Sequence, residues 1–184
     1  MVGPAQEGGP LVVVDGWGPM AEELVAQLRR SGVVVHGGLH AADGAELAMR
    51  SWGVAPRVVV VVAEGREPDW AGAPWQARGI PHVVVVIGTD SVMVGPLVLP
   101  GRSACLACVA GAWTGSLSSA SRRLPREAVV LASAVATVTV LTALRGDDCL
   151  AGISTEVSLD KIAVTHRLWG ARHDCRCASA TMTG

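Results

Sequence analysis

The stretch GPLVLPGRSACLAC, residues 95–108, is the part of the sequence around which the rest of the chain is organised. Its composition predicts a strand, a tight turn, and a Cys-x-x-Cys knuckle formed by Cys105 and Cys108. A second close pair, Cys175 and Cys177, follows after 66 intervening residues. Two such pairs are typical of a four-thiolate zinc site, in which each pair supplies two of the four tetrahedral ligands. We therefore predict a structural zinc knuckle with these four cysteines as its ligands.

Other interpretations of the cysteines stay open at this point. The four thiols could instead form two disulfides, but the chain shows no signal peptide, so an oxidising compartment is not expected. His173 could replace one thiolate, and the Cys-x-Cys spacing of the second pair is tighter than usual. The fifth cysteine, Cys149, stands alone and is interpreted as an ordinary loop thiol.

The composition of the chain excludes several classes of function. Its 184 residues suit one domain, half of them are hydrophobic, and the net charge of -1 argues against an electrostatic nucleic-acid surface. Phe and Tyr are absent, which also argues against base-stacking platforms. Residues 128–144 form an uncharged run that contains Ser and Thr and is shorter than a typical membrane span. We predict a buried helix there, and no membrane segment.

The first forty residues have the pattern of a Rossmann-like unit. Residues 11–14 are a continuous apolar run, which is typical of a central parallel strand covered on both faces. A glycine turn with Gly16 and Gly18 follows, then a helix ending near residue 31 and a strand at 33–35. The acidic residue that would hold a ribose after the second strand is replaced by His36-Gly37-Gly38. We therefore predict Gly16 and Gly18 as a weak, degenerate nucleotide turn, and we do not expect ATP binding.

The remaining pattern completes an α/β fold with a mostly parallel sheet, flanking helices and a C-terminal hairpin. Residues 82–87 and 91–99 are predicted as adjacent antiparallel strands, since only three residues separate them. The other predicted elements are a helix at 43–52, a strand at 57–63, a loop at 64–73, a short helix at 75–78, a mobile Ser/Gly-rich stretch at 111–125, a buried helix at 126–145, and a two-stranded ribbon over 156–169.

The expected domain organisation is simple. Residues 1–10 are predicted to be a flexible tail and residues 179–184 a second tail. Residues 11–178 are predicted to form a single domain. Its Rossmann half covers residues 11–100, and the half with the zinc knuckle, helix and hairpin covers residues 101–178.

This order of elements resembles the ThiF/MoeB-type fold shared with ubiquitin-activating (E1-like) enzymes. The resemblance covers residues 11–178 and is carried by two motifs, Pro-Gly-x-x-x-Cys-x-x-Cys at 100–108 and His-Asp-Cys-Arg-Cys at 173–177. Residues 79–108 resemble in particular the divergent ThiF-like branch found in gene clusters for ribosomally synthesised modified (RiPP) peptides that carry azolines or thioamides. The domain boundaries above follow this resemblance.

The resemblance implies a role as a partner protein. Members that adenylate a peptide carboxylate carry acidic and Asn/Arg motifs that residues 36–39 and 63–66 lack; Glu64 and Arg66 are interpreted as solvated loop residues. We therefore expect a non-catalytic, cytoplasmic homodimer without catalytic residues. It would dock to a YcaO-type cyclodehydratase or thioamide synthetase and help present the precursor peptide. The branch's N-terminal peptide-binding winged-helix lobe is not expected in this chain.

Two alternative functions follow from the same residues. One is an ATP-dependent adenylyltransferase that uses Gly16 and Gly18 at the phosphates to activate a peptide carboxylate. The other is a zinc-stabilised dimeric interaction module outside peptide modification.

Overall fold

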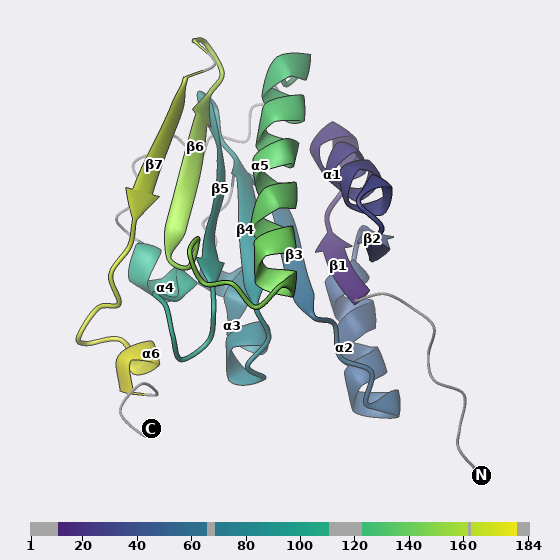
Figure 1. Ribbon diagram of the computed structural model, residues 1–184, viewed down its shortest axis with the longest axis vertical. Helices are drawn as coiled ribbons and strands as arrows, with labels where there is room; N and C mark the ends of the chain where they lie inside the picture. Colours follow the sequence, from purple (N-terminus) through teal and green to yellow (C-terminus); the bar gives the residue numbers. More distant parts are fainter. Residues whose placement is uncertain (1–10, 66–68, 111–122, 162, 180–184) are drawn as a thin grey trace.

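The computed structural model describes residues 11–65, 69–110, 123–161 and 163–179, and its centre is a seven-stranded sheet in the order β2-β1-β3-β4-β5-β6-β7 (Figure 1). The predicted tail at 1–10, residues 111–122 of the predicted mobile stretch, and residues 180–184 lie outside the described residues. The strands are β1 (Leu11–Asp15), β2 (Val34–Gly38), β3 (Val58–Glu64), β4 (His82–Ile87), β5 (Ser91–Val98), β6 (Ile153–Ser158) and β7 (Val164–Leu168). The helices are α1 (Gly18–Arg30), α2 (Ala41–Trp52), α3 (Asp69–Ala77), α4 (Leu106–Val109), α5 (Arg126–Leu144) and α6 (Arg176–Ser179).

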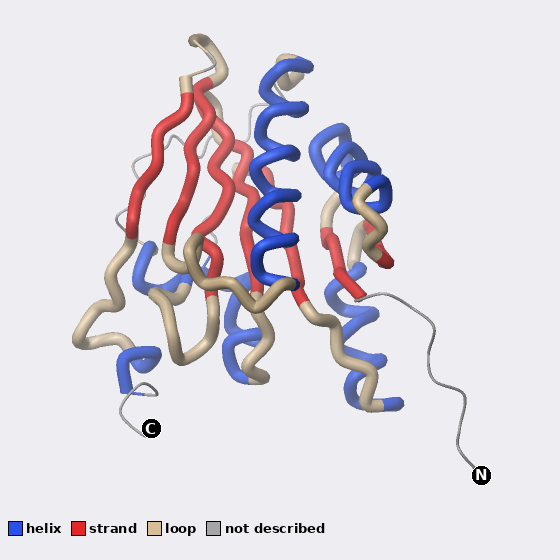
Figure 2. The backbone as a smooth tube through the Cα atoms, viewed as in Figure 1, coloured by secondary structure: helices blue, strands red, loops and turns tan. Residues whose placement is uncertain are grey.

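The strand directions confirm the predicted α/β class with a mostly parallel sheet. Strands β2, β1, β3 and β4 pair in parallel, as expected for strand–helix–strand units. The short connection at residues 88–90 makes β5 antiparallel to β4, and β6 and β7 continue as antiparallel neighbours. Strands β2 and β7 therefore form the two edges of the sheet, and Figure 2 shows β7 at the edge farthest from β1 and β2.

Helices α1 and α5 cover one face of the sheet and lie side by side (Figure 1). Their apolar side chains meet Val12, Val14 and Val60 of the central strands in one buried cluster. Among the described residues, α5, with 19 residues, is the one helix long and apolar enough to span a membrane. More than half of its most apolar 18-residue stretch is buried inside this protein, which agrees with the predicted core helix. Its valines and threonines are poor helix formers, so burial holds it.

The opposite face is covered by α2, α3 and the cysteine knuckle. Val13, Val59 and Val84 point to this side and pack with Trp75 of α3 and Leu106 of α4. Consecutive valines along one strand thus serve two cores, because successive side chains of a strand point to opposite faces. The arrangement explains why the central strands are uninterrupted apolar runs.

Several predicted elements differ from the structure; for example, β2 extends to Gly38 and therefore includes His36-Gly37-Gly38, which was predicted to follow the strand. Helix α3 begins at Asp69, although Gly72 and Pro74 led to the prediction of a loop as far as Ala73. Burial of Ala71 (5% exposed) and Trp75 (2% exposed) outweighs the backbone hydrogen bond that a proline removes from the helix. Strand β6 also begins earlier than predicted, and its first residues pair with the end of β7.

Candidate metal centre and glycine turn

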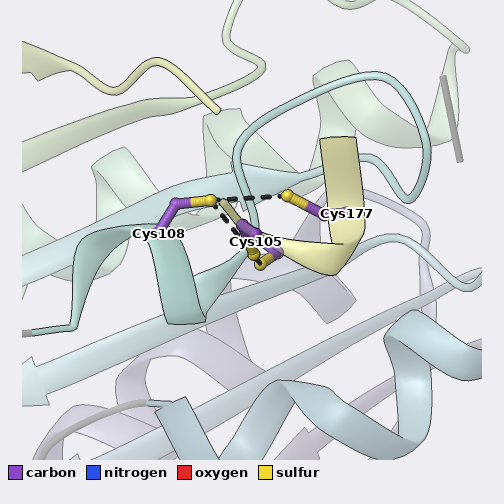
Figure 3. A group of neighbouring side chains, drawn as sticks. Cys105, Cys108 and Cys177 are labelled. Atoms are coloured by element: carbon purple, nitrogen blue, oxygen red, sulfur yellow. Dashed lines mark hydrogen bonds between the residues drawn. The ribbon is translucent and has the colours of Figure 1, made fainter. Parts of the chain in front are cut away.

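The structure brings together the four cysteines that the sequence predicted as metal ligands. Their Sγ atoms all lie within 4.8 Å of one another. Figure 3 shows the side chains of Cys105, Cys108 and Cys177 directed toward one another. The Sγ–Sγ distances are 3.8 Å between Cys105 and Cys108, 3.5 Å between Cys105 and Cys175, and 3.4 Å between Cys108 and Cys177. These values are far longer than a disulfide bond of about 2.05 Å. They are close to the edge of about 3.8 Å expected for four thiolates placed tetrahedrally at about 2.3 Å from one ion.

Backbone N–H groups act on the sulfur atoms of the cluster. The amide of Arg172 donates to Cys108 Sγ over 3.4 Å. The backbone amides of Cys108, Cys177 and Cys105 act to lower the pKa of Cys105, Cys175 and Cys177, respectively. Such donors stabilise thiolates and orient them, as the outer shell of a metal site does. The donor set therefore fits a metal ion.

Burial and these amides act in opposite directions on the thiols. Burial raises the pKa of Cys105 and of Cys177, because a charged thiolate is poorly solvated there. The hydrogen bond from the backbone amide of Cys177 lowers the pKa of Cys175 to about 7. Three of the four cysteines are buried and Cys175 is half-buried, so a bound ion would be shielded from water. A closed cluster of this kind leaves no coordination position for a substrate.

Local structure explains how the two pairs meet. Cys105 precedes the single turn of α4, whose Leu106 is buried against the sheet. The second pair lies at the start of α6. In the loop before it, the Arg172 side chain donates two hydrogen bonds, of 3.0 and 2.7 Å, to the Asp174 carboxylate. His173 is exposed and lies outside the sulfur cluster, so it does not replace a thiolate. Cys149 is also exposed and outside it.

The second predicted feature, the glycine turn, lies between β1 and α1. Gly16 has a φ of +141°, and a Cβ atom there would lie 2.8 Å from Val62 Cβ. Glycine at this position is therefore needed for packing against β3. Gly18, with a φ of +82°, begins α1 and has no neighbour within 4 Å of a built Cβ. Both line a small pocket of about 250 Å³ that shares no lining residue with the cysteine cluster.

Two residues reduce the capacity of this pocket to hold phosphates. Pro19 occupies the first turn of α1 and has no N–H to donate. The side chain of Glu22 lines the pocket and would repel an anion, although Arg29 also lines it. The turn thus offers fewer anion-binding groups than an open helix N-terminus.

Three buried polar side chains were not singled out from the sequence. Within the described ranges, the buried side-chain atoms without a hydrogen-bond partner are Asp15 Oδ1, Gln76 Oε1 and His82 Nε2. Burial raises the pKa of the Asp15 carboxyl and lowers the pKa of His82 to about 4. The signal available for His82 was its position as the one polar residue of an otherwise apolar strand.

Comparison with known structures finds a similar fold in heterocyclases and in MccB of E. coli. A heterocyclase solved in complex with substrate and cofactor has a TM-score of 0.66 and 16% identity, over 92% of this chain and 25% of the heterocyclase. MccB of E. coli solved with ATP has a TM-score of 0.66 and 15% identity, over 92% of this chain and 67% of MccB. The heterocyclase TruD has a TM-score of 0.60 and 16% identity, over 92% of this chain and 27% of TruD.

These similarities confirm the predicted resemblance at the level of the fold. The chain spans about a quarter of the length of the heterocyclases and about two thirds of MccB. No family model matches the sequence, and no curated protein matches it.

Proposed function

We propose that this chain is a non-catalytic, divergent ThiF-like subunit of modified-peptide biosynthesis, which docks to a YcaO-type cyclodehydratase or thioamide synthetase and helps present the precursor peptide. The observation that carries the proposal is a fold shared with heterocyclases and MccB in which the glycine turn has few groups for phosphate. Pro19 and Glu22 are the residues that weaken the turn as an anion site. We place the protein in the cytoplasm, where free thiols persist.

The partner role is tested with the YcaO-type protein encoded beside this chain. The tagged chain is expected to retain that protein in a pull-down and to raise the rate at which it modifies the precursor peptide. ATP titration by calorimetry on the chain alone is expected to show no binding. A chain that neither associates with the YcaO-type protein nor stimulates it would contradict the proposal.

A working adenylyltransferase is the second candidate. It is favoured by the pocket of about 250 Å³ at the glycine turn and by the likeness to MccB, which has been solved with ATP. ATP–pyrophosphate exchange in the presence of a candidate peptide would support this function. If the Gly18→Asp variant loses ATP–pyrophosphate exchange, the ATP site is at the glycine turn, because an added carboxylate repels the phosphates.

We further propose that the four thiolates bind one zinc ion as a structural staple. Zinc prefers four sulfur or nitrogen ligands in a tetrahedron, and the sulfur cluster supplies four with amide donors behind them. Elemental analysis is expected to give about one zinc per chain. If another metal is found at that stoichiometry, the bound ion is that metal and not zinc. If no metal is found, the proposal of a metal site is contradicted.

We propose a homodimer in which α5 contributes to the interface. Val130 and Val138 of this helix are 47% and 55% exposed, so they present apolar surface that a second copy of the chain would cover. Light scattering is expected to give twice the chain mass, and Val138→Glu is expected to give the monomer. Val54→Glu is the matched control, because Val54 is also exposed but lies in a loop outside α5. A monomeric parent chain would contradict the dimer.

A further inference from the structure

A cavity of about 610 Å³ lies between α3 and the cysteine knuckle, and because Cys105, Cys175 and Cys177 line it, part of this volume is the metal site itself. Small side chains from both sides line it: Ala73 and Ala77 of α3, and Ala107 of α4. Leu106 adds an apolar wall, and the loop before α6 forms the rim. The volume lies within the usual range of ligand pockets, about 300–1,000 Å³. The cavity is separate from the glycine turn, since the two share no lining residue.

The wall of this cavity includes two buried hydrogen-bond acceptors without partners. Nδ1 of His82 lies 2.9 Å from the carbonyl oxygen of Ile80, which can only accept, so Nδ1 carries the proton and Nε2 presents a lone pair. Gln76 Oε1 is the second acceptor. Both residues line the cavity, and neither acceptor has a partner in the part of the chain that the structure describes. Buried polar groups are normally paired, so two orphans at one cavity point to a ligand with a donor.

The packing around these acceptors favours access from the cavity. A Cβ atom at Gly72 would lie 2.8 Å from His82 Nε2 and 2.8 Å from Leu106 Cδ1. Glycine at this position therefore leaves the imidazole edge free of a covering methyl group. The acceptor atoms themselves are covered, so a donor reaches them only when the side chains around them move. The Gln76 side chain, which lines the cavity, is half-buried, and its Oε1 has no hydrogen bond to the described residues.

The charged side chains lie at the rim, while Cys105, Cys175 and Cys177 on the wall are negatively charged as thiolates, which disfavours an anionic ligand. Arg172 and Asp174 neutralise each other through their paired hydrogen bonds, while Arg176 is exposed at the same rim. The interior therefore suits an uncharged group, and the rim suits the carbonyl oxygens of an attached chain. An apolar body that ends in a neutral N–H donor meets both conditions, and the indole of tryptophan is such a group.

We propose that this cavity binds a tryptophan-like side chain of a peptide, with its N–H donated to Gln76 Oε1 or His82 Nε2. The identification of the occupant as a peptide rests on the function proposed above. The apolar lining and the two acceptors of the cavity are independent of that function. The site would give the chain a peptide contact of its own, on the face of the sheet opposite α1 and α5.

The proposal is tested by NMR titration of the full, isotopically labelled and metal-loaded chain with N-acetyl-tryptophanamide. Shift changes are expected at α3, at the knuckle and at residues 172–177. The 1-methylindole analogue has no N–H donor, and its affinity is expected to be about tenfold lower. Gln76→Leu is expected to weaken the parent probe and to reduce the difference between the two probes, because it removes one acceptor.

Steric controls address binding elsewhere on the surface. Ala77→Phe fills the cavity from an exposed helix position and is expected to abolish the shifts. Ala55→Phe, at an exposed position outside the cavity, is expected to leave them unchanged. Absence of shifts, equal affinity for the two probes, or shifts that survive Ala77→Phe would overturn the site.

The outcome of this experiment is independent of the outcome of the test for the partner role. Probe binding without YcaO association would keep the cavity as a ligand site and remove its peptide context. YcaO association without probe binding would keep the proposed function and remove this cavity from it.

Discussion

Gln27 of α1 and Ser133 of α5, which are 106 residues apart in the sequence, are joined by a hydrogen bond of 2.8 Å from Gln27 Nε2 to Ser133 Oγ. The other end of the same amide accepts a 3.3 Å hydrogen bond from Thr137 Oγ1, and its Nε2 also donates to Glu23. Ser133 is fully buried. One glutamine thus connects α1 to α5 in a largely apolar interface.

Replacing this glutamine with an apolar residue is expected to loosen the contact between α1 and α5. Gln27→Leu leaves the hydroxyl of Thr137 without its partner, so the free energy of unfolding is expected to fall by about 1–3 kcal/mol. Urea denaturation measures the change. Glu22→Leu, at an exposed site of the same helix, is the control and should stay within about 0.5 kcal/mol. Equal stabilities of the two variants would show that the network contributes nothing.

Removing one cysteine ligand is expected to remove the metal and destabilise the fold. Cys175→Ser leaves three ligands, and because metal binding to such sites is coupled to folding, the variant should lose several kcal/mol or fail to fold. Elemental analysis and thermal unfolding measure the two effects. Cys149→Ser is the matched control, since this thiol is exposed and outside the cluster. A metal-free Cys175→Ser protein as stable as the parent would refute a structural role for the metal.

Buried His82 is expected to make stability depend on pH. Burial lowers its pKa from 6.5 to about 4, so between these values the unfolded chain takes up a proton that the folded chain does not. Above pH 6.5 the contribution of His82 to the free energy of unfolding does not change with pH. As the pH drops from 6.5 towards 4, this contribution lowers the free energy of unfolding by about 3 kcal/mol in all. In His82→Asn, which cannot titrate, this part of the slope should be absent. Denaturation series at several pH values measure the difference between variant and parent, which cancels other titrating groups.

The two glycines of the turn are expected to respond differently to alanine. In Gly16→Ala the new methyl group would lie 2.8 Å from Val62 Cβ at a φ of +141°, so a loss of roughly 3 kcal/mol is expected. In Gly18→Ala no neighbour is within 4 Å, and only the backbone conformation costs about 1–2 kcal/mol. Chemical denaturation of both variants gives the comparison. A larger loss in Gly18→Ala would contradict the packing role assigned to Gly16.

The features that the sequence predicted well are those set by local chemistry. Cysteine pairs supply ligands whatever surrounds them, and an uninterrupted valine run requires cover on both faces of a sheet, so the knuckle and the central strands could be located. The extent of α3 could not be predicted, because burial of Trp75 overrides the signals from glycine and proline. The cavity beside Gln76 could not be predicted either, since it forms where segments about a hundred residues apart meet.

The central residues of the valine-rich strands do little to fix the register between neighbouring strands. Residues 58–62 of β3 and 83–86 of β4 are all valine, so a sliding of one strand past the other by one or two positions would still place valine against valine. Correct alignment must therefore come from the strand ends, where His82 is opposite Val59 and Glu64 is opposite Ile87. Glu64→Val would lengthen the uniform stretch, and slipped, trapped chains should then accumulate during refolding.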